Sequence, residues 1–272
     1  MIVAIDIDAQ NTFTPLCPEE LPVSGGTEIV AELNAQAALA ALRVMSKDAH
    51  CREALWRCET PAEMLKPTGL KNADVTWVAH GIVGSYGFRL IEGLPAPTDY
   101  DFCVWKGMEP DLHPYGICYH DLEGRLSTGL LEWLQVKGAR TLLVGGLATD
   151  YCVKTSVLQL LNARLGFRVI VNQAACRGIG LETTAAAWRE MAAAGAMRAP
   201  AMTAPPTPVA AAPMATPVPT APTAAPAIAP APSCGAPDTR PVAMPGPKMP
   251  SASKASEASI TTSAWSMEGS SG

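Results

Sequence analysis

The chain has 272 residues, enough for one or two domains, and a formal net charge of −5. This acidic balance provides no basic surface for DNA, RNA or an anionic membrane, and no apolar run is long enough to cross a bilayer. We therefore expect neither nucleic acid nor a membrane as a partner.

The composition of the chain changes sharply near its end. Residues 1–198 have the composition of an ordinary globular domain, whereas residues 199–272 are dominated by Ala, Pro and Thr and finally by Ser. A segment of this kind lacks the apolar and aromatic content that offsets the entropy cost of ordering. We therefore predict one folded domain over 1–198 and a disordered tail over 199–272.

Two buried strands are predicted near the start of the chain. Residues 2–7 form the first and lead into Asp8, and residues 42–45 form a weaker one that leads toward Asp48. The Ala-rich stretch between them, at 27–42, predicts a helix.

The middle of the chain is less regular. Residues 51–75 show no clear periodicity, which predicts an irregular loop with a short helix around 62–65. A strand at 102–105 then leads into Lys106. Prolines and a glycine predict a loop at 111–119, followed by a helix at 129–137.

A Gly-rich turn follows the strand predicted at 141–144 and precedes an apolar helical stripe that Gly166 ends. Thr149 or Asp150 is the predicted N-cap of this helix, which puts Cys152 in its first turn. A thiol there loses its proton more easily, because it lies near the positive end of the helix dipole. The alternative is a small buried cysteine at a strand–helix corner.

A strand at 168–171 and a helix at 181–194 complete the predicted domain. The segment 196–200 is short and bounded by proline, so we do not expect it to form a good strand. Strands that alternate with helices predict a three-layer α/β/α fold with a mostly parallel central sheet. Ligands of such sheets bind beyond the carboxyl ends of the strands, where four strands deliver Asp8, Asp48, Lys106 and Cys152.

Six motifs follow one another along the chain: Asp8-Ala-Gln-Asn-Thr-Phe13, Leu21-Pro-Val-Ser-Gly-Gly26, Lys47-Asp48-Ala49-His50, Trp77-Val-Ala-His80, Trp105-Lys106-Gly107 and Gly146-Leu-Ala-Thr-Asp-Tyr-Cys152. Their order and spacing resemble those of nicotinamidases/pyrazinamidases of the isochorismatase-like cysteine hydrolase superfamily. The resemblance runs from Ile2 to about Gly195. It implies an enzyme of NAD salvage whose small-molecule partner is nicotinamide, which it deamidates to nicotinate and ammonia. The sequence leaves open whether the chain forms a homo-oligomer.

Asp8, Lys106 and Cys152 match the catalytic triad of that family residue for residue. Cys152 would attack the amide carbonyl to give a thioester, and Asp8 would move the protons. Lys106 would stabilise the thiolate and keep Asp8 ionised. The backbone N–H groups of Ala148 and Cys152 point to an oxyanion hole.

Asp48 and His50 stand two residues apart, so both point to one side of an extended segment, as two ligands of one metal would. His80 would be the third ligand. The resemblance implies a divalent metal ion that holds the pyridine nitrogen, with Zn²⁺ first and Fe²⁺ or Mn²⁺ as alternatives. Some relatives carry a further histidine between these two motifs, and its absence here would lower metal affinity.

The resemblance assigns Phe13, Trp77 and Tyr115 to an apolar pocket for the substrate ring. No motif includes His113 or His120, and we expect both at the surface.

Some positions depart from the family pattern. Thr12 stands where the opening motif has a second Asp, and a hydroxyl cannot supply that charge. Gly81 replaces a Cys, and Ala49 replaces an aromatic residue. These departures concern substrate identity more than reaction class.

Two alternatives to a nicotinamidase remain. One is a metal-independent cysteine amidohydrolase of the same superfamily that acts on a carbamoyl or ureido substrate. The other is a non-enzymatic binding protein, against which the complete set of Asp8, Lys106 and Cys152 argues.

The cytoplasm is the expected compartment. Met1 runs directly into the first predicted strand, which leaves no room for a signal peptide. The eight cysteines are scattered, and Cys152 would lose its function in a disulfide, so a reducing environment is expected.

Overall fold

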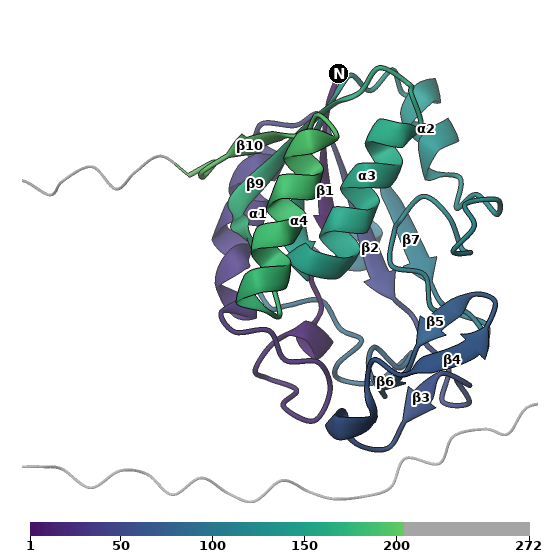
Figure 1. The fold of residues 1–272 in the computed structure, drawn as a ribbon. Helices are drawn as coiled ribbons and strands as arrows, with labels where there is room; N and C mark the ends of the chain where they lie inside the picture. Colours follow the sequence, from purple (N-terminus) through teal and green to yellow (C-terminus); the bar gives the residue numbers. More distant parts are fainter. Residues whose placement is uncertain (204–272) are drawn as a thin grey trace, which may run out of the picture. The chain divides into compact units, whose positions relative to one another are not determined.

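The computed structural model describes residues 1–203, and the tail predicted to be disordered lies outside the described residues from 204 onward. A six-stranded sheet in the order β10-β9-β8-β1-β2-β7 forms the centre of the fold (Figure 1). All five pairs of neighbouring strands are parallel. The strands are β1 (Ile2–Ile7), β2 (Leu42–Asp48), β7 (Phe102–Lys106), β8 (Thr141–Leu147), β9 (Arg168–Arg177) and β10 (Met197–Ala199).

Helices cover both faces of the sheet, which confirms the predicted three-layer α/β/α fold. In Figure 1, α3 (Lys154–Asn162) and α4 (Leu181–Ala193) lie in front of the sheet and α1 (Val30–Ala38) lies behind it. The helix α2 (Leu130–Val136) shares the hydrophobic core of α3 and α4. The predicted helix at 27–42 is divided into a 3₁₀ turn, Gly26–Ile29, and α1, which ends at Ala38.

Two apolar clusters on opposite faces of the sheet account for this packing. Val3, Ile5 and Ile7 of β1 pack with the apolar sides of α2, α3 and α4. Ile29 and Leu33 pack on the other face, beside Ala175 of β9. Because the central strands are covered on both faces, they read as nearly continuous apolar runs, which is typical of parallel sheets.

The region predicted as an irregular loop at 51–75 contains more regular structure than expected. It holds β3 (Arg57–Cys58), β4 (Pro67–Leu70) and β5 (Ala73–Val75), and β3 pairs with β6 (Trp77–Val78). The strands β4 and β5 form an antiparallel hairpin. The short helix predicted here is a 3₁₀ turn at Pro61–Glu63. It begins with a capping box that Thr60 and Glu63 form.

The expectation that 196–200 would not form a strand is wrong. Met197–Ala199 forms β10, which pairs in parallel with β9 at the edge of the sheet. Arg198 donates to Gln173 at 2.8 Å and lies over the Trp188 ring, so contacts with the rest of the domain hold this short segment. Met202 and Thr203 continue past β10 and donate their backbone N–H groups to the Glu32 carboxylate of α1.

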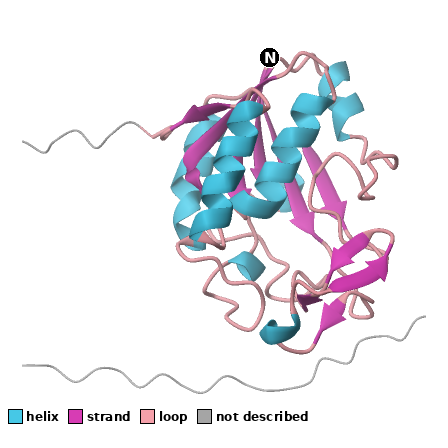
Figure 2. Ribbon diagram, viewed as in Figure 1, coloured by secondary structure: helices cyan, strands magenta, loops and turns pink. Residues whose placement is uncertain are grey.

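Loops and small strands gather beyond the carboxyl ends of the central strands (Figure 2). Two further 3₁₀ turns in the described chain are Asn11–Phe13 and Pro97–Asp99. Within residues 1–203, no helix is both long enough and apolar enough to cross a membrane.

Candidate active site and metal centre

Asp8 follows β1 directly and is fully buried at the carboxyl edge of the sheet. Ser46 of β2 fixes this carboxylate, because its hydroxyl donates to Asp8 Oδ1 at 2.6 Å and accepts the Asp8 backbone N–H at 3.2 Å. Lys106, the last residue of β7, places its Nζ 2.9 Å from Asp8 Oδ2. Two neighbouring strand ends therefore hold a carboxylate and an ammonium in contact.

Cys152 completes a group with these two residues. It lies in a wide helical turn, Thr149–Val153, between β8 and α3, and its Sγ is 3.6 Å from Lys106 Nζ. The carboxylates of Asp8 and Asp48 and the Cys152 sulfur all lie within 4.8 Å of one another. The structure thus brings together the three residues that the sequence predicted as a triad.

The expectation of an easily ionised thiol is wrong, because Cys152 is only 5% exposed. Burial raises the pKa of Cys152 well above its usual value, and Asp8 and Asp48 add to this effect while Lys106 opposes it. Burial also raises the pKa of Asp8, against the effect of Lys106. The thiol is therefore neutral at rest, and a carboxylate with an elevated pKa lies beside it to accept a proton.

Lys106 is buried together with two carboxylates. Although burial alone would lower the pKa of Lys106, Asp48 and Asp8 hold it well above its usual value. Burial alone would likewise raise the pKa of Asp48, but Lys106 and His50 hold it well below its usual range. The lysine is therefore cationic and Asp48 is ionised.

The turn that carries Cys152 is fixed in a way that the sequence did not indicate. Neither Thr149 nor Asp150 caps the helix; the N-cap position is Ala148, without a side-chain hydrogen bond. Asp150 instead accepts hydrogen bonds from the backbone N–H groups of Ile179 and Gly180 and from the Thr183 hydroxyl. The predicted N-cap is thus wrong, because this carboxylate ties the cysteine turn to the beginning of α4.

Gly146 allows β8 to approach β1 closely just before this turn. Its φ is +139°, and a Cβ built there would lie 2.0 Å from the carbonyl oxygen of Ile7. Only glycine fits this position. Ala148 and Cys152 both line the pocket beyond it, so the predicted oxyanion donors lie on the wall of one cavity.

Asp48, His50 and His80 lie together, as the sequence predicted. His50 Nε2 is 3.7 Å from Asp48 Oδ1, and His80 Nε2 is 3.7 Å from Asp48 Oδ2. Each Nδ1 faces a backbone carbonyl, that of Gly107 for His50 and that of Val78 for His80. Because a carbonyl only accepts, both Nδ1 atoms carry the proton and both Nε2 atoms keep a lone pair, which is the usual arrangement of metal-binding histidines.

Among the described residues, the Nε2 atom of His50 has no hydrogen-bond partner. A buried lone pair beside an ionised carboxylate and a second imidazole is the donor set that a divalent metal ion requires. These residues therefore fit a divalent metal.

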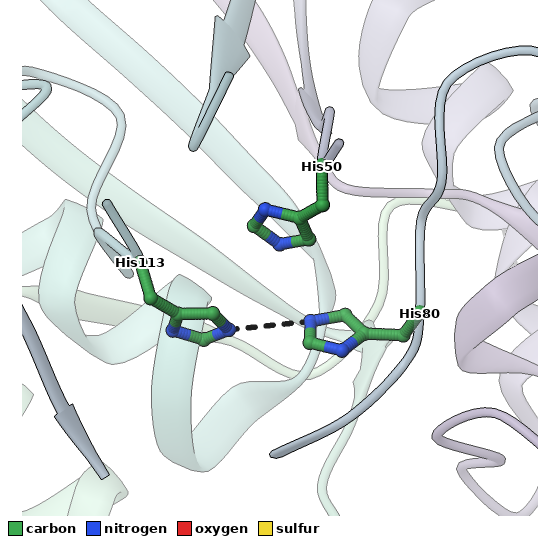
Figure 3. A group of neighbouring side chains, drawn as sticks. All are labelled: His50, His80 and His113. Carbon is green, nitrogen blue, oxygen red and sulfur yellow. Dashed lines mark hydrogen bonds between the residues drawn. The ribbon is translucent and has the colours of Figure 1, made fainter. Parts of the chain in front are cut away.

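The expectation that His113 lies at the surface is wrong. His113 is only 3% exposed, and its ring points toward those of His50 and His80 (Figure 3). Burial lowers the pKa of His113 well below its usual value, and His50 and His80 add to this effect, so the ring is neutral. His120, by contrast, is partly exposed. No motif or periodicity identifies His113 in the sequence, because the folding of its loop over the site determines its position.

A pocket connects the Cys152 group with the histidine cluster. Its walls include the three predicted ring-binding residues Phe13, Trp77 and Tyr115, together with Cys152, Asp48, His80 and His113. Leu21, Tyr151 and Ile179 also line it, and the sequence did not single them out. The aromatic side chains of Phe13, Trp77 and Tyr115 in its walls suit a flat ring.

The structure also supplies the charge that Thr12 lacks. The Thr12 hydroxyl donates to the Glu20 carboxylate, and the Gly81 backbone N–H lies 3.0 Å from both the Thr12 Oγ1 and the Glu20 Oε2 atoms. Glu20 thus provides a carboxylate beside the residue that follows His80.

These features define a class of protein: an α/β hydrolase with a thiol, a carboxylate and a lysine at the carboxyl edge of a parallel sheet. Comparison with known proteins gives a related family. The sequence profile of the isochorismatase domain matches residues 110–204. In this part the chain is similar to the isochorismatase-like hydrolases.

Three known proteins illustrate the similarity. The chain is 42% identical to the nicotinamidase of Escherichia coli over 139 residues, which are 43% of this chain and 64% of that protein. The solved structure of a nicotinamidase/pyrazinamidase from Acinetobacter baumanii is 27% identical, with a TM-score of 0.64, and the match covers 72% of this chain and 94% of that one. A Pyrococcus horikoshii pyrazinamidase solved in complex with zinc is 25% identical, with a TM-score of 0.56 and coverages of 73% and 98%.

Proposed function

We propose that this protein is a nicotinamidase that hydrolyses nicotinamide to nicotinate and ammonia in NAD salvage. The observation that carries the proposal is the pocket whose walls contain Cys152, the aromatic side chains, His80 and His113 together. A flat ring bound there would present its carboxamide to the thiol and its ring nitrogen to the metal ligands. The similarity to nicotinamidases supports this assignment.

The triad residues would act in sequence on the carboxamide. As the Cys152 sulfur bonds to the carbonyl carbon, the thiol proton passes to Asp8 and the carbonyl electron pair moves to oxygen, which the N–H groups of Ala148 and Cys152 would stabilise. The C–N bond then breaks, Asp8 returns the proton to nitrogen, and ammonia leaves. The neutral resting thiol makes this base necessary, because a neutral thiol is a poor nucleophile.

Hydrolysis of the thioester would use the same groups. Asp8 removes a proton from a water molecule, whose oxygen bonds to the acyl carbon while the C–S bond breaks. Cys152 regains its proton and nicotinate leaves. Lys106, which contacts Asp8 and lies 3.6 Å from the sulfur, would stabilise negative charge on the sulfur throughout.

Asp48, His50 and His80 would hold a divalent ion, which when bound supplies an electron-pair acceptor for the pyridine nitrogen. Zn²⁺ is the first candidate and Fe²⁺ or Mn²⁺ are alternatives, because imidazole and carboxylate ligands suit all of them. The zinc in the Pyrococcus horikoshii relative supports this choice.

For domain organisation, we propose that residues 1–198 form the catalytic domain. The contacts of Met202 and Thr203 with Glu32 support a boundary a few residues later. A cytoplasmic location remains a proposal, which the free thiols of all seven cysteines within the described chain support.

Ammonia release from nicotinamide tests the proposed function. The purified full chain should release ammonia and nicotinate in equal amounts, and a Cys152→Ala variant should release neither. A wild-type protein that leaves nicotinamide intact but hydrolyses a ureido substrate would overturn the proposal in favour of the metal-independent amidohydrolase.

A further inference from the structure

The loop between β7 and α2 brings His113 into the metal centre. Its Nε2 lies 3.3 Å from His80 Nε2, and the ligand atoms of His50, His80 and His113 lie within 4.8 Å of one another (Figure 3). Two imidazole nitrogens bound to one tetrahedral ion at 2.0–2.1 Å are separated by roughly 3.3 Å. The two nitrogens are therefore already at the spacing that a shared metal ion requires.

The ring of His113 is held in this position from several sides. It stacks between His50, with ring centroids 5.1 Å apart, and Trp77, with centroids 5.9 Å apart. Its backbone N–H donates to the Asn72 carbonyl at 2.7 Å, and the indole N–H of Trp56 donates to the preceding carbonyl, that of Leu112. A ring fixed in this way is prepared for a ligand and loses little freedom on binding one.

The polar groups of this ring are otherwise unsatisfied. Its Nδ1 has no hydrogen-bond partner among the described residues, and its Nε2 approaches only the Nε2 of His80. Since His80 Nδ1 carries the proton, His80 Nε2 presents a lone pair to His113. Either His113 donates a hydrogen bond to that lone pair, or two lone pairs face each other and a cation lies between them.

The hydrogen-bond alternative conflicts with metal binding by His80. A hydrogen bond from His113 would occupy the lone pair that His80 needs as a ligand. The unpartnered Nε2 of His50 lies 3.7 Å from one Asp48 oxygen, and the Nε2 of His80 lies 3.7 Å from the other. A cation bound between the imidazoles would therefore lie beside an ionised carboxylate.

We propose that His113 is a fourth protein ligand of the metal ion, beside Asp48, His50 and His80. This inference rests on the metal centre in the proposed function. Some relatives carry a further histidine between the motifs of His50 and His80. In this chain, His113 would take that role from the loop between β7 and α2. Because His113 also lines the pocket, the substrate nitrogen would approach the metal ion beside this residue.

Metal affinity measured without substrate tests the proposal. We would titrate the metal-free full chain with Co²⁺ and Zn²⁺ against a competing chelator, for the wild type, His113→Ala, His113→Asn and the loop control His120→Ala. Removing a ligand should weaken binding by more than the roughly 10–100-fold typical of outer-sphere partners. The visible spectrum of bound Co²⁺ should change in both His113 variants and remain that of the wild type in His120→Ala.

The hydrogen-bond alternative predicts the opposite. His113→Ala would then bind the metal as tightly as the wild type or more tightly, with an unchanged Co²⁺ spectrum, and this result would overturn the proposal. X-ray absorption of the zinc-loaded wild type adds a measurement that does not depend on the folding of a variant. Three imidazole ligands would support the proposal and two would overturn it. A wild type that binds no metal would overturn the metal centre as well, whereas ammonia release separately tests the amidase assignment.

Discussion

Asp48 forms an ion pair with Lys106, and both side chains are buried. The same lysine contacts Asp8, so one cation joins the carboxylate of the metal centre to the carboxylate beside the nucleophile. Loss of this cation would leave two carboxylates buried and uncompensated, a condition that proteins tolerate poorly.

Lys106→Met should therefore abolish turnover and also destabilise the fold. We expect the free energy of unfolding to fall by about 3–5 kcal/mol, the cost of removing one partner from a buried ion pair. Urea unfolding measures this change. The control is Lys154→Met, which breaks a partly exposed ion pair with Glu190 and should cost about 0–1 kcal/mol. Equal effects of the two substitutions would contradict the assigned burial.

Asp8→Asn should have opposite effects on turnover and on thiol reactivity. Turnover should cease because the base is lost, but iodoacetamide should label Cys152 faster at neutral pH. The reason is that the Asp8 charge helps to raise the pKa of this thiol. Mass spectrometry of the labelled peptide gives the rate, and the exposed Cys103 is the internal control. Slower labelling of Cys152 in the variant would be inconsistent with this electrostatic effect.

Glu20→Gln should weaken metal binding, because the Glu20 carboxylate holds the Gly81 N–H, next to His80, in place. We expect a loss of about tenfold, the lower end of outer-sphere effects. Adding Thr12→Asp to this variant should restore affinity by returning the carboxylate to the motif position. Chelator competition measures each step. Glu19→Gln, at the exposed neighbouring position, should change nothing, and failure of the double variant to recover would refute the compensation.

Asp6 should make stability fall as pH rises. Burial raises its pKa from 3.8 to about 6, despite Arg43. Between these values the folded chain binds more protons than the unfolded chain, so this contribution is largest near pH 4 and is lost as pH passes 6. Compared with Asp6→Asn, the wild type should lose about 2.4 kcal/mol from pH 4 to 7, at 1.36 kcal/mol per pKa unit, because Asp6 of the unfolded chain is already partly ionised at pH 4. Urea unfolding at each pH gives the difference, and a flat difference would exclude the raised pKa.

Two truncated chains should differ in stability although they end only four residues apart. A chain that ends at Thr203 should keep its rate within about twofold, because the removed residues are rich in Ala, Pro and Ser and poor in the apolar side chains of a core. A chain that ends at Ala199 leaves the Glu32 carboxylate without the N–H groups of Met202 and Thr203. It should lose about 1–3 kcal/mol, the cost of unsatisfied buried polar atoms. Thermal unfolding compares the two, and equal stability would contradict the role of this contact.

The sequence predicted the parts of this fold that depend on local pattern. Apolar runs located β1 and β8, and helical periodicity located α4 to within one residue. The meeting of Asp8, Lys106 and Cys152 also followed, because the carboxyl ends of parallel strands share one edge. Most helices and strands of the domain can therefore be predicted from the pattern of apolar residues within a few positions of one another.

Features that depend on contacts between distant segments could not be predicted. His113 belongs to no motif, and its loop is held over the site by hydrogen bonds to the distant residues Asn72 and Trp56. The short strand β10 forms because β9 offers it backbone partners. Burial in the folded chain raises the pKa of Cys152. The sequence indicated only that this thiol lies at the start of a helix, a position that favours loss of its proton.

The contacts of Asp150 bear on how a substrate enters. This carboxylate links the cysteine turn to Ile179, Gly180 and Thr183, so these segments form one continuous wall of the pocket. The facing wall has its own link, since the Trp77 indole donates to the Tyr115 hydroxyl. Tyr151 of the first wall packs edge-on against Trp77 of the second, with ring centroids 5.1 Å apart, so any widening of the pocket must separate these two rings. Cys152 would then stay with the wall that Asp150 holds, and the Trp77 ring with the wall that carries Tyr115.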